Sequence, residues 1–178
     1  TDTVFAAADR CTTVKERLLG RTQSRHPQQM VRVDRESPQE VLPPLTEELL
    51  RAVERHAAVV DVTLVSDYKK GVCSDRLLSS IVATCRRRGI PLIADPARDV
   101  DYRRYAGATA ITPNRSEAGN AVGRRIVVPE DGLEVARQLL AFGVEVAMVT
   151  LDRDGIAWAD ARGRAELVPA EQHEVHDV

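Results

Sequence analysis

Two patterns of hydrophobic and polar residues follow each other along the chain, and they predict two kinds of structure. In residues 28–34, Val31 and Val33 alternate with charged neighbours, which is the two-residue period of a strand with one side in water. Residues 12–19 are predicted to form a second strand, and the polar connection 20–27 suits a hairpin loop. This first part contains no convincing helix, so it is expected to be a small β-strand lid.

Beyond residue 36 the period changes, and strands are expected to alternate with helices. Thr46, Ser74 and Asp131 are predicted to begin three helices, because their side chains can cap the free amides of a first turn. Gly89 and Gly143 are predicted to end the second and the third helix. The predicted strands cover residues 59–65 (as a buried strand), 91–94, 108–112, 144–150, 156–159 and 165–168, with a turn at Arg162-Gly163 between the last two.

This alternation indicates an α/β fold, with a mostly parallel sheet flanked by helices. In such sheets, ligands bind at the carboxyl ends of the parallel strands. Although a purely structural sheet would also have polar loops, we expect a ligand site at this edge. Polar groups follow four predicted strands, at residues 66–71, 95–96, 112–114 and 150–152.

Composition narrows the classes of partner. The 178 residues carry a net charge of -2, which gives no reason to expect a nucleic acid or an anionic membrane as partner. The low aromatic content of 3% also argues against a surface that stacks on bases. Cys11, Cys73 and Cys85 are far apart and form no metal-ligand spacing with histidines, so neither a disulfide nor a zinc site is expected. A reducing cytoplasm fits this composition.

The sharpest local motif is Asn114-Arg115-Ser116-Glu117, where a predicted strand gives way to a helix. One interpretation is a capping box, in which Asn114 and Glu117 satisfy amides of the first helical turn. The other is an amide and a carboxylate beside the positive end of a helix, where Mg²⁺ and phosphate oxygens can be organised. The two are compatible. Neither GxxxxGK[ST] nor GxGxxG occurs, which excludes the P-loop and dinucleotide Rossmann classes by motif.

A series of segments in fixed order resembles one family. The series is similar to the kinase domain of the bacterial bifunctional heptose 7-phosphate kinase/heptose 1-phosphate adenylyltransferase, a ribokinase-like (PfkB) carbohydrate kinase. The similarity runs nearly end to end, and the block 95–117 is its most specific part. The segments are residues 11–17, 28–34, 66–71, 94–96, 101–109, 112–117 and 149–155.

The resemblance implies a ribokinase-like fold and transfer of the ATP γ-phosphate to a sugar hydroxyl, with Mg²⁺ bridging phosphates. The expected substrate is D-glycero-β-D-manno-heptose 7-phosphate, phosphorylated at the anomeric hydroxyl in ADP-heptose and lipopolysaccharide core synthesis. One lysine of the sugar loop is expected to meet the 7-phosphate, although a solvated lysine pair is an equal alternative. The implied residues are Asn114, Ser116, Glu117, Thr150 and Gly155 for the nucleotide, Glu117 for the metal, and Asp67, Lys69 and Lys70 for the sugar.

The resemblance also implies that residues 1–178 are a partial kinase domain, with a lid at about 12–34 and a body at about 43–178. The N-terminal sugar-binding strands, the Gly-rich segment with the general base, expected just after Val178, and the adenylyltransferase half are absent from this sequence. No catalytic residue is therefore assigned within the chain, and the chain alone is expected to be inactive. Arg98 stands near the position where relatives often carry a lysine, with the spacing shifted by one.

Two other functions stay open at this point: another PfkB-family carbohydrate kinase, and a non-catalytic remnant that binds nucleotide or a partner chain. We also expect that the lid pairs with its copy in a homodimer, since an exposed strand edge favours such pairing.

Overall fold

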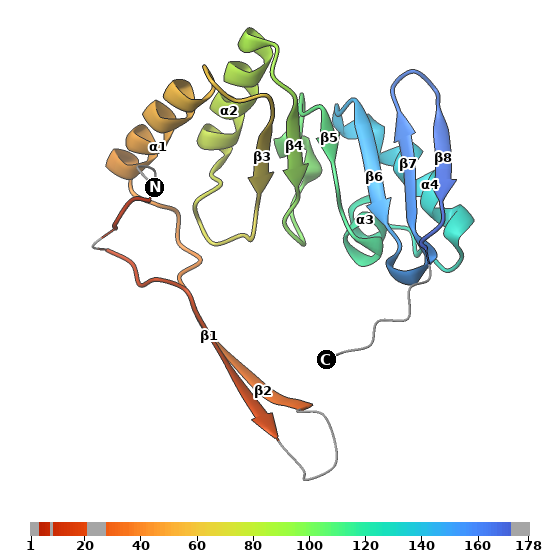
Figure 1. Cartoon of the computed structure of the whole chain (residues 1–178), viewed down its shortest axis with the longest axis horizontal. Helices are drawn as coiled ribbons and strands as arrows, with labels where there is room; N and C mark the ends of the chain where they lie inside the picture. Colours follow the sequence, from red (N-terminus) through yellow and green to blue (C-terminus); the bar gives the residue numbers. More distant parts are fainter. Residues whose placement is uncertain (1–3, 8, 21–27, 172–178) are drawn as a thin grey trace.

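The described part of the chain forms a six-stranded sheet, four α-helices and a separate two-stranded hairpin (Figure 1). The computed structural model describes residues 4–7, 9–20 and 28–171. The helices are α1 (Pro43–His56), α2 (Asp75–Arg88), α3 (Arg115–Val122) and α4 (Pro129–Leu139), with short 3₁₀ helices η1 (Tyr102–Tyr105), η2 (Leu140–Phe142) and η3 (Asp152–Asp154). The strands are β1 (Val14–Gly20), β2 (Gln28–Arg35), β3 (Thr63–Ser66), β4 (Leu92–Asp95), β5 (Ala110–Ile111), β6 (Val146–Thr150), β7 (Ile156–Asp160) and β8 (Ala165–Val168).

The large sheet has the order β3-β4-β5-β6-β7-β8. Strands β3 to β6 are parallel, and β7 and β8 run antiparallel to their neighbours. This confirms the predicted α/β class with a mostly parallel sheet. Because the four parallel strands are neighbours in space, their carboxyl ends meet at one edge of the sheet.

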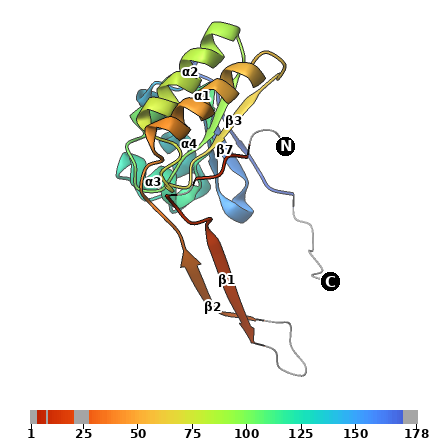
Figure 2. The ribbon, with the colours of Figure 1, turned by 90° about the vertical axis from the view of Figure 1, so that its left-hand side faces the viewer.

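The core lies between the sheet and the helices, which Figure 2 shows together on one side of it. Along each strand, alternate residues face this layer, as the two-residue side-chain period requires. Val65, Ala94, Ala147, Val149 and Ala157 are buried there. By contrast Leu64, the neighbour of Val65 in β3, is exposed.

Several helix ends follow the sequence prediction. Ser74 caps α2, since its hydroxyl oxygen accepts a hydrogen bond from the Leu77 amide, and Gly89 ends the helix in the left-handed conformation. Gly143 ends the helical turn that continues α4. Helix α4 itself begins at Pro129, two residues before the predicted start, because the Asp131 carboxylate reaches back to the amides of residues 127 and 128.

Two predictions in the region before α2 were wrong. Thr46 does not cap α1, which begins at Pro43; the Thr46 hydroxyl lies inside the helix and donates to the Leu42 carbonyl at 3.4 Å. Proline suits the first helical position because it has no amide hydrogen to satisfy. The buried strand predicted at 59–65 is also shorter, since β3 begins at Thr63 and the valines before it are exposed. The turn that ends α1 occupies those positions.

The remaining predicted strands are present, with ends shifted by a few residues. Strands β1 and β2 form the predicted antiparallel hairpin. It extends from the body on the side to which the carboxyl ends of the parallel strands point (Figures 1 and 2). The predicted hairpin loop lies outside the described residues from 21 to 27. No helix of the described ranges is long and apolar enough to cross a membrane.

Candidate active site

Four strand ends meet at one edge of the sheet, as predicted. The Asp67 amide donates to the Asp95 carbonyl at 2.9 Å, which joins the ends of β3 and β4. The Thr112 amide bonds to the Ala94 carbonyl at 3.0 Å, which joins the ends of β4 and β5. Asn114 forms a parallel bridge with Thr150, which joins the residues after β5 to the end of β6. The polar groups that follow these strands therefore share one site.

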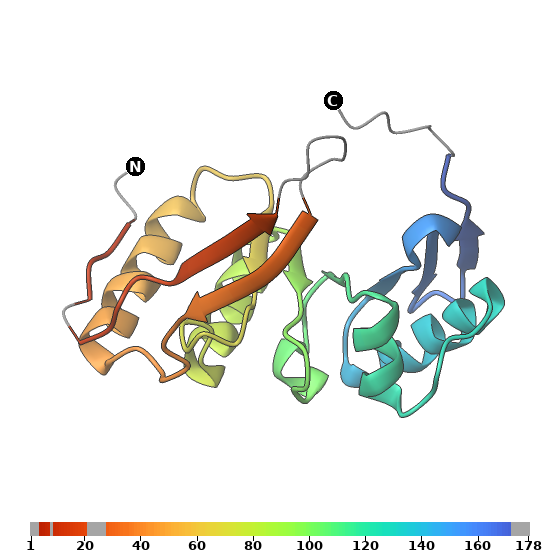
Figure 3. The same cartoon turned by 90° about the horizontal axis from the view of Figure 1, so that it is seen from below.

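A cavity of about 560 Å³ opens at this edge, and we call it the strand-edge cavity. The cavity brings together two distant parts of the sequence. The predicted sugar loop after β3, which begins near Asp67, lies beside Glu117 at the start of α3, 50 residues further along the chain. Figure 3 views the molecule from below, toward the edge where the cavity lies, with the hairpin in front. The lining side chains include Asp67, Lys69, Lys70, Asp95, Arg98, Asp99 and Glu117.

Backbone strain is concentrated at the same edge. Among the described residues, the positive φ angles outside glycine are those of Lys69 (55°), Asp99 (57°) and Asp152 (55°). These three residues follow β3, β4 and β6 respectively. Non-glycine residues in this conformation cost free energy and occur preferentially at functional sites. The clustering supports a functional rather than a merely structural edge.

The cations around the strand-edge cavity differ in their partners. The Lys70 ammonium forms an ion pair with Glu36, just beyond the hairpin. The Lys69 ammonium donates to the Asp99 carbonyl at 3.0 Å. Arg98 is exposed and forms no ion pair with the described residues. Thus both lysines are held in place, but only Lys70 is neutralised; Lys69 and Arg98 have no counter-ion among the described residues.

Asp67 is buried, with 6% of its surface exposed. One carboxylate oxygen accepts from the Lys69 amide at 2.8 Å, and the other accepts from the Tyr105 hydroxyl at 2.7 Å. The Arg104 guanidinium lies 3.7 Å from the same carboxylate. Sequence reasoning missed Tyr105 and Arg104, although both lie inside the most specific block of the resemblance.

The Asn114–Glu117 motif forms a complete capping box. The Glu117 amide donates to Asn114 Oδ1, and the Asn114 amide donates to Glu117 Oε2, both at 3.0 Å. The second Glu117 oxygen, Oε1, accepts no hydrogen bond from the described residues. The structural interpretation of the motif is therefore correct, and it leaves one oxygen of Glu117 available at the strand-edge cavity.

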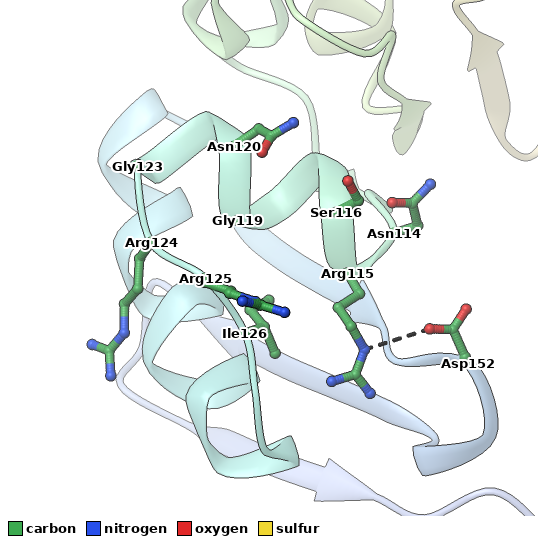
Figure 4. A pocket seen from close by; sticks show the side chains of 10 residues that line it. All are labelled: Asn114, Arg115, Ser116, Gly119, Asn120, Gly123, Arg124, Arg125, Ile126 and Asp152. Atoms are coloured by element: carbon green, nitrogen blue, oxygen red, sulfur yellow. Dashed lines mark ion pairs between the residues drawn. The ribbon is translucent and has the colours of Figure 1, made fainter.

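A second cavity, of about 900 Å³, lies beside α3 and the segment that follows this helix (Figure 4). Asn114, Ser116 and Asp152 line it together with Arg115 and other residues of α3 and the loop that follows. The Arg115 guanidinium donates to the Leu151 carbonyl at 2.9 Å and pairs with Asp152 and Asp154. This tether fixes the loop after β6, and it was not expected from the sequence.

Thr150 and Gly155, unlike the other predicted nucleotide residues, line neither cavity; Thr150 is exposed at the end of β6, beside Asn114. Gly155 has a different role. It is buried, and its φ of 102° lies in the region that favours glycine. A Cβ atom at this position would lie 2.0 Å from the Val168 carbonyl oxygen, so β8 leaves no room for a side chain. Gly155 lines neither cavity; it allows the tight turn between β6 and β7.

The residues fit a magnesium ion that brings most of its ligands with it. Magnesium is commonly held by one or two carboxylates together with phosphate oxygens and water. Glu117 offers Oε1, and Asp95 and Asp99 line the same cavity. No group of three or more Asp, Glu, His or Cys side chains within the described ranges is arranged to hold a metal ion. A metal here would therefore need a phosphate-bearing ligand.

Comparison with known proteins identifies the family. A profile described as "pfkB family carbohydrate kinase" matches residues 29–178. The chain belongs to this family. The match covers most of the chain, and it confirms the resemblance stated from the sequence motifs.

Curated proteins that are similar to this chain support the same family assignment. The protein named Bifunctional protein HldE of Geotalea uraniireducens (strain Rf4) is 38% identical over 177 residues, covering 98% of this chain and 35% of that protein. The protein of the same name from Syntrophotalea carbinolica (strain DSM 2380 / NBRC 103641 / GraBd1) is 39% identical over 172 residues, covering 96% and 34%. The chain thus spans about a third of the length of these relatives.

Solved structures agree on the fold. The Arabidopsis thaliana ribokinase complexed with ribose and ATP superposes with a TM-score of 0.63 at 14% identity, covering 90% of this chain and 49% of that chain. A structure titled "Crystal Structure of Sa239" superposes with a TM-score of 0.68 at 13% identity, covering 96% and 53%. The fold is therefore ribokinase-like.

Proposed function

We propose that this chain is part of an ATP-dependent sugar kinase whose substrate is D-glycero-β-D-manno-heptose 7-phosphate. The observation that carries the proposal is the strand-edge cavity, where the sugar loop and Glu117 line one space. The product would be the 1,7-bisphosphate, formed in the cytoplasm on the route to ADP-heptose and the lipopolysaccharide core. Relatives named HldE support this choice of sugar over other substrates of the family.

The sugar side of the site is proposed to lie at the loop after β3 and the residues after β4. The 7-phosphate is a dianion near neutral pH, so a cation that is not already neutralised is the best contact for it. Lys70 is paired with Glu36, whereas neither Arg98 nor Lys69 has a counter-ion among the described residues, and the Lys69 ammonium already donates to the Asp99 carbonyl. Arg98 is therefore our preferred phosphate contact, with Lys69 beside it; Asp67 and Lys70 contribute to the shape of this side.

The nucleotide side is proposed to lie at the start of α3. Asn114, Ser116 and Thr150 would face the ATP phosphates, while Gly155 shapes the turn behind them. Glu117 would hold Mg²⁺ through Oε1, and the ion would neutralise charge on the transferring phosphoryl group. The positive end of α3 favours the same phosphates.

Proton transfer is assigned to no residue of the described ranges. The resemblance implies that the general base follows Val178, so the complete gene product is the protein to which the proposed activity belongs. Residues 1–178 alone are predicted to show no kinase turnover, because the base and the anion-binding amides act directly on the reacting groups.

The experiment is phosphorylation of a panel of sugars and sugar phosphates by the full-length gene product, with ATP and Mg²⁺. Heptose 7-phosphate should give the highest kcat/KM. Glu117→Gln should lower kcat/KM about a hundredfold or more, because it weakens an electrostatic contact made near the transferring group. Glu130→Gln, at an exposed site in the first turn of α4, is the matched control and should retain full activity.

Each alternative has its own outcome. Preference for a different sugar would identify another PfkB-family carbohydrate kinase. ATP binding without any turnover would favour the non-catalytic nucleotide-binding remnant. Wild-type turnover that survives Glu117→Gln unchanged would refute the proposed role of Glu117 while leaving the kinase activity in place.

We also propose that the hairpin pairs with its copy in a homodimer. The register of β1 and β2 puts Val14, Leu18, Val31 and Val33 on one face, together with the exposed Glu16–Arg35 ion pair, since Leu18 is opposite Val31, Glu16 is opposite Val33 and Val14 is opposite Arg35. All four apolar residues are exposed. Lys15, on the charged face, approaches the Tyr68 ring of the body, with 6.0 Å between its ammonium and the ring centroid. The apolar face is thus left for a partner, and a second copy offers the same apolar face.

A further inference from the structure

Side chains of the 3₁₀ helix η1 contact both loops on the proposed sugar side of the strand-edge cavity, the loop after β3 and the loop after β4. Helix η1 lies between β4 and β5, and two of its side chains are almost completely buried: Tyr102 is 2% exposed and Tyr105 is 1% exposed. Both rings pack in the core, and their centroids are 5.9 Å apart in an edge-to-face arrangement. Within the described part of the chain, however, only the Tyr105 hydroxyl has hydrogen-bond partners.

The Tyr105 hydroxyl bridges the two loops. It donates to Asp67 Oδ2 at 2.7 Å and accepts from the Ala97 amide at 3.1 Å. Burial raises the pKa of Tyr105 above its ordinary range, and the Asp67 carboxylate adds to this shift. The hydroxyl therefore keeps its proton at neutral pH, and the donor and acceptor roles of the bridge are fixed.

The bridge acts on the residues that carry the cations. Asp67 also accepts from the Lys69 amide at 2.8 Å, in the turn where Lys69 has its left-handed backbone. Ala97 directly precedes Arg98 in the sequence. The Lys69 ammonium then reaches the Asp99 carbonyl at 3.0 Å, which joins the two loops a second time. One hydroxyl group thus helps to set the separation of Lys69 and Arg98.

Arg104, the residue before Tyr105, holds the far end of the sugar loop. Its guanidinium donates to the Cys73 carbonyl at 2.6 Å and pairs with Asp75 at 3.0 Å. The loop between Asp67 and Cys73 is therefore fixed at both ends by neighbouring residues of η1. A strained loop persists only where its surroundings determine its conformation, and η1 supplies those contacts.

We propose that Tyr105 is a positioning residue for the phosphate group of the sugar substrate, acting through Asp67 and Ala97. This inference rests on the proposed function. It also assigns a positioning role to Asp67, because the hydrogen bonds from Tyr105 and Lys69 occupy both of its oxygens. Lys69 and Arg98 are the groups that would touch the phosphate.

The test compares Tyr105→Phe with Tyr102→Phe in the full-length gene product. The two tyrosines share η1, the same burial and the same loss of one oxygen atom, but the Tyr102 hydroxyl has no hydrogen-bond partner among the described residues. Tyr105→Phe should raise the KM for the sugar phosphate about tenfold, as expected for the loss of a hydrogen bond to a charged group. The KM for ATP should change less than about twofold, and Tyr102→Phe should change neither.

Two further readouts separate positioning from stability. Hydrogen exchange of the Lys69 and Ala97 amides should accelerate in Tyr105→Phe and not in Tyr102→Phe. In an Asp67→Asn background, Tyr105→Phe should have a smaller effect on the sugar KM, because the two residues act through one bond.

The inference is wrong if Tyr105→Phe lowers the melting temperature while the sugar KM stays within about twofold of wild type. That result would make the bridge purely structural. If the wild type phosphorylates no sugar phosphate, the proposed function fails instead, and the exchange of Lys69 and Ala97 still tests the bridge on its own.

Discussion

The hairpin and the large sheet share the two-residue period of a strand but not one environment. Val31 and Val33 lie on one face of β2, alternate with charged residues and are exposed, whereas Ala147 and Val149 lie on one face of β6, have the apolar neighbours Val146 and Met148, and are fully buried. The pattern determines that a strand forms and which residues share a face. Whether that face is buried depends on what lies against it, and the body supplies helix α4 to β6 and β7 but no helix to the hairpin.

The largest expected effect is a difference in the cost of truncating a leucine in each region. Leu139 is 0% exposed in the core, and Leu139→Ala should lower the free energy of unfolding by about 2–5 kcal/mol. Leu18 is 58% exposed in the hairpin, and Leu18→Ala should change the free energy of unfolding of the monomer by less than about 0.5 kcal/mol. Urea denaturation of residues 1–178 at low protein concentration measures both.

Equal losses of unfolding free energy in Leu139→Ala and Leu18→Ala would contradict the difference between the body and the hairpin. In that case the hairpin would be packed against the body, and its apolar face would not be available to a second copy. If Leu18→Ala leaves the free energy of unfolding of the monomer unchanged, the apolar face of the hairpin has no intramolecular role.

The next effect concerns assembly of the full-length gene product. Leu18→Asp introduces a charge into the apolar face of the hairpin and should weaken the dimer about a hundredfold or more, because the carboxylate would lose its water on association. Arg17→Asp, on the charged face, is the matched control and should leave the dimer intact. Analytical ultracentrifugation over a range of concentrations measures both. A wild type that is monomeric throughout, or a dimer unaffected by Leu18→Asp, would refute pairing through this face.

Local signals were enough to predict the parts of the fold that depend on neighbours in sequence. Ser74 and Gly89 bound α2 as predicted, and Asn114 and Glu117 form the predicted capping box, because each contact spans only a few residues. Thr46 was wrongly predicted as a cap, since a proline nearby offered a better start to the helix.

Contacts between distant residues could not be predicted in this way. Tyr105 and Asp67 are separated by 38 residues, and the pairing of β3 with β4 and the packing of η1 in the core bring them together. Nothing about Tyr105 in the sequence distinguishes it from Tyr102, which is about equally buried but whose hydroxyl has no hydrogen-bond partner among the described residues. The resemblance identified the block that contains both tyrosines, but the geometry was needed to separate their roles.

The smallest expected effect again distinguishes the two regions, and it depends on pH. Hydrogen bonds from the Val127 and Val128 amides hold the pKa of Asp131 below its ordinary value of 3.8, with Arg124 adding to the shift. A carboxyl group whose pKa is lowered by folding stabilises the folded state above its unfolded pKa, and that contribution is lost as the pH falls through the folded pKa. Asp131→Asn should therefore lower the melting temperature by a few degrees at pH 7, and the difference should shrink as the pH falls below 3.8.

The hairpin offers the matched control for this measurement. Glu16 pairs with Arg35 at 3.3 Å, but both side chains are at least half exposed, and such surface pairs contribute little to stability. Glu16→Gln should leave the melting temperature unchanged at pH 7, whereas Asp131→Asn should lower it, in thermal unfolding followed by circular dichroism. If both variants lost the same stability, the Asp131 cap would be no stronger than an exposed ion pair. The body would then hold this carboxylate no more firmly than the hairpin holds Glu16.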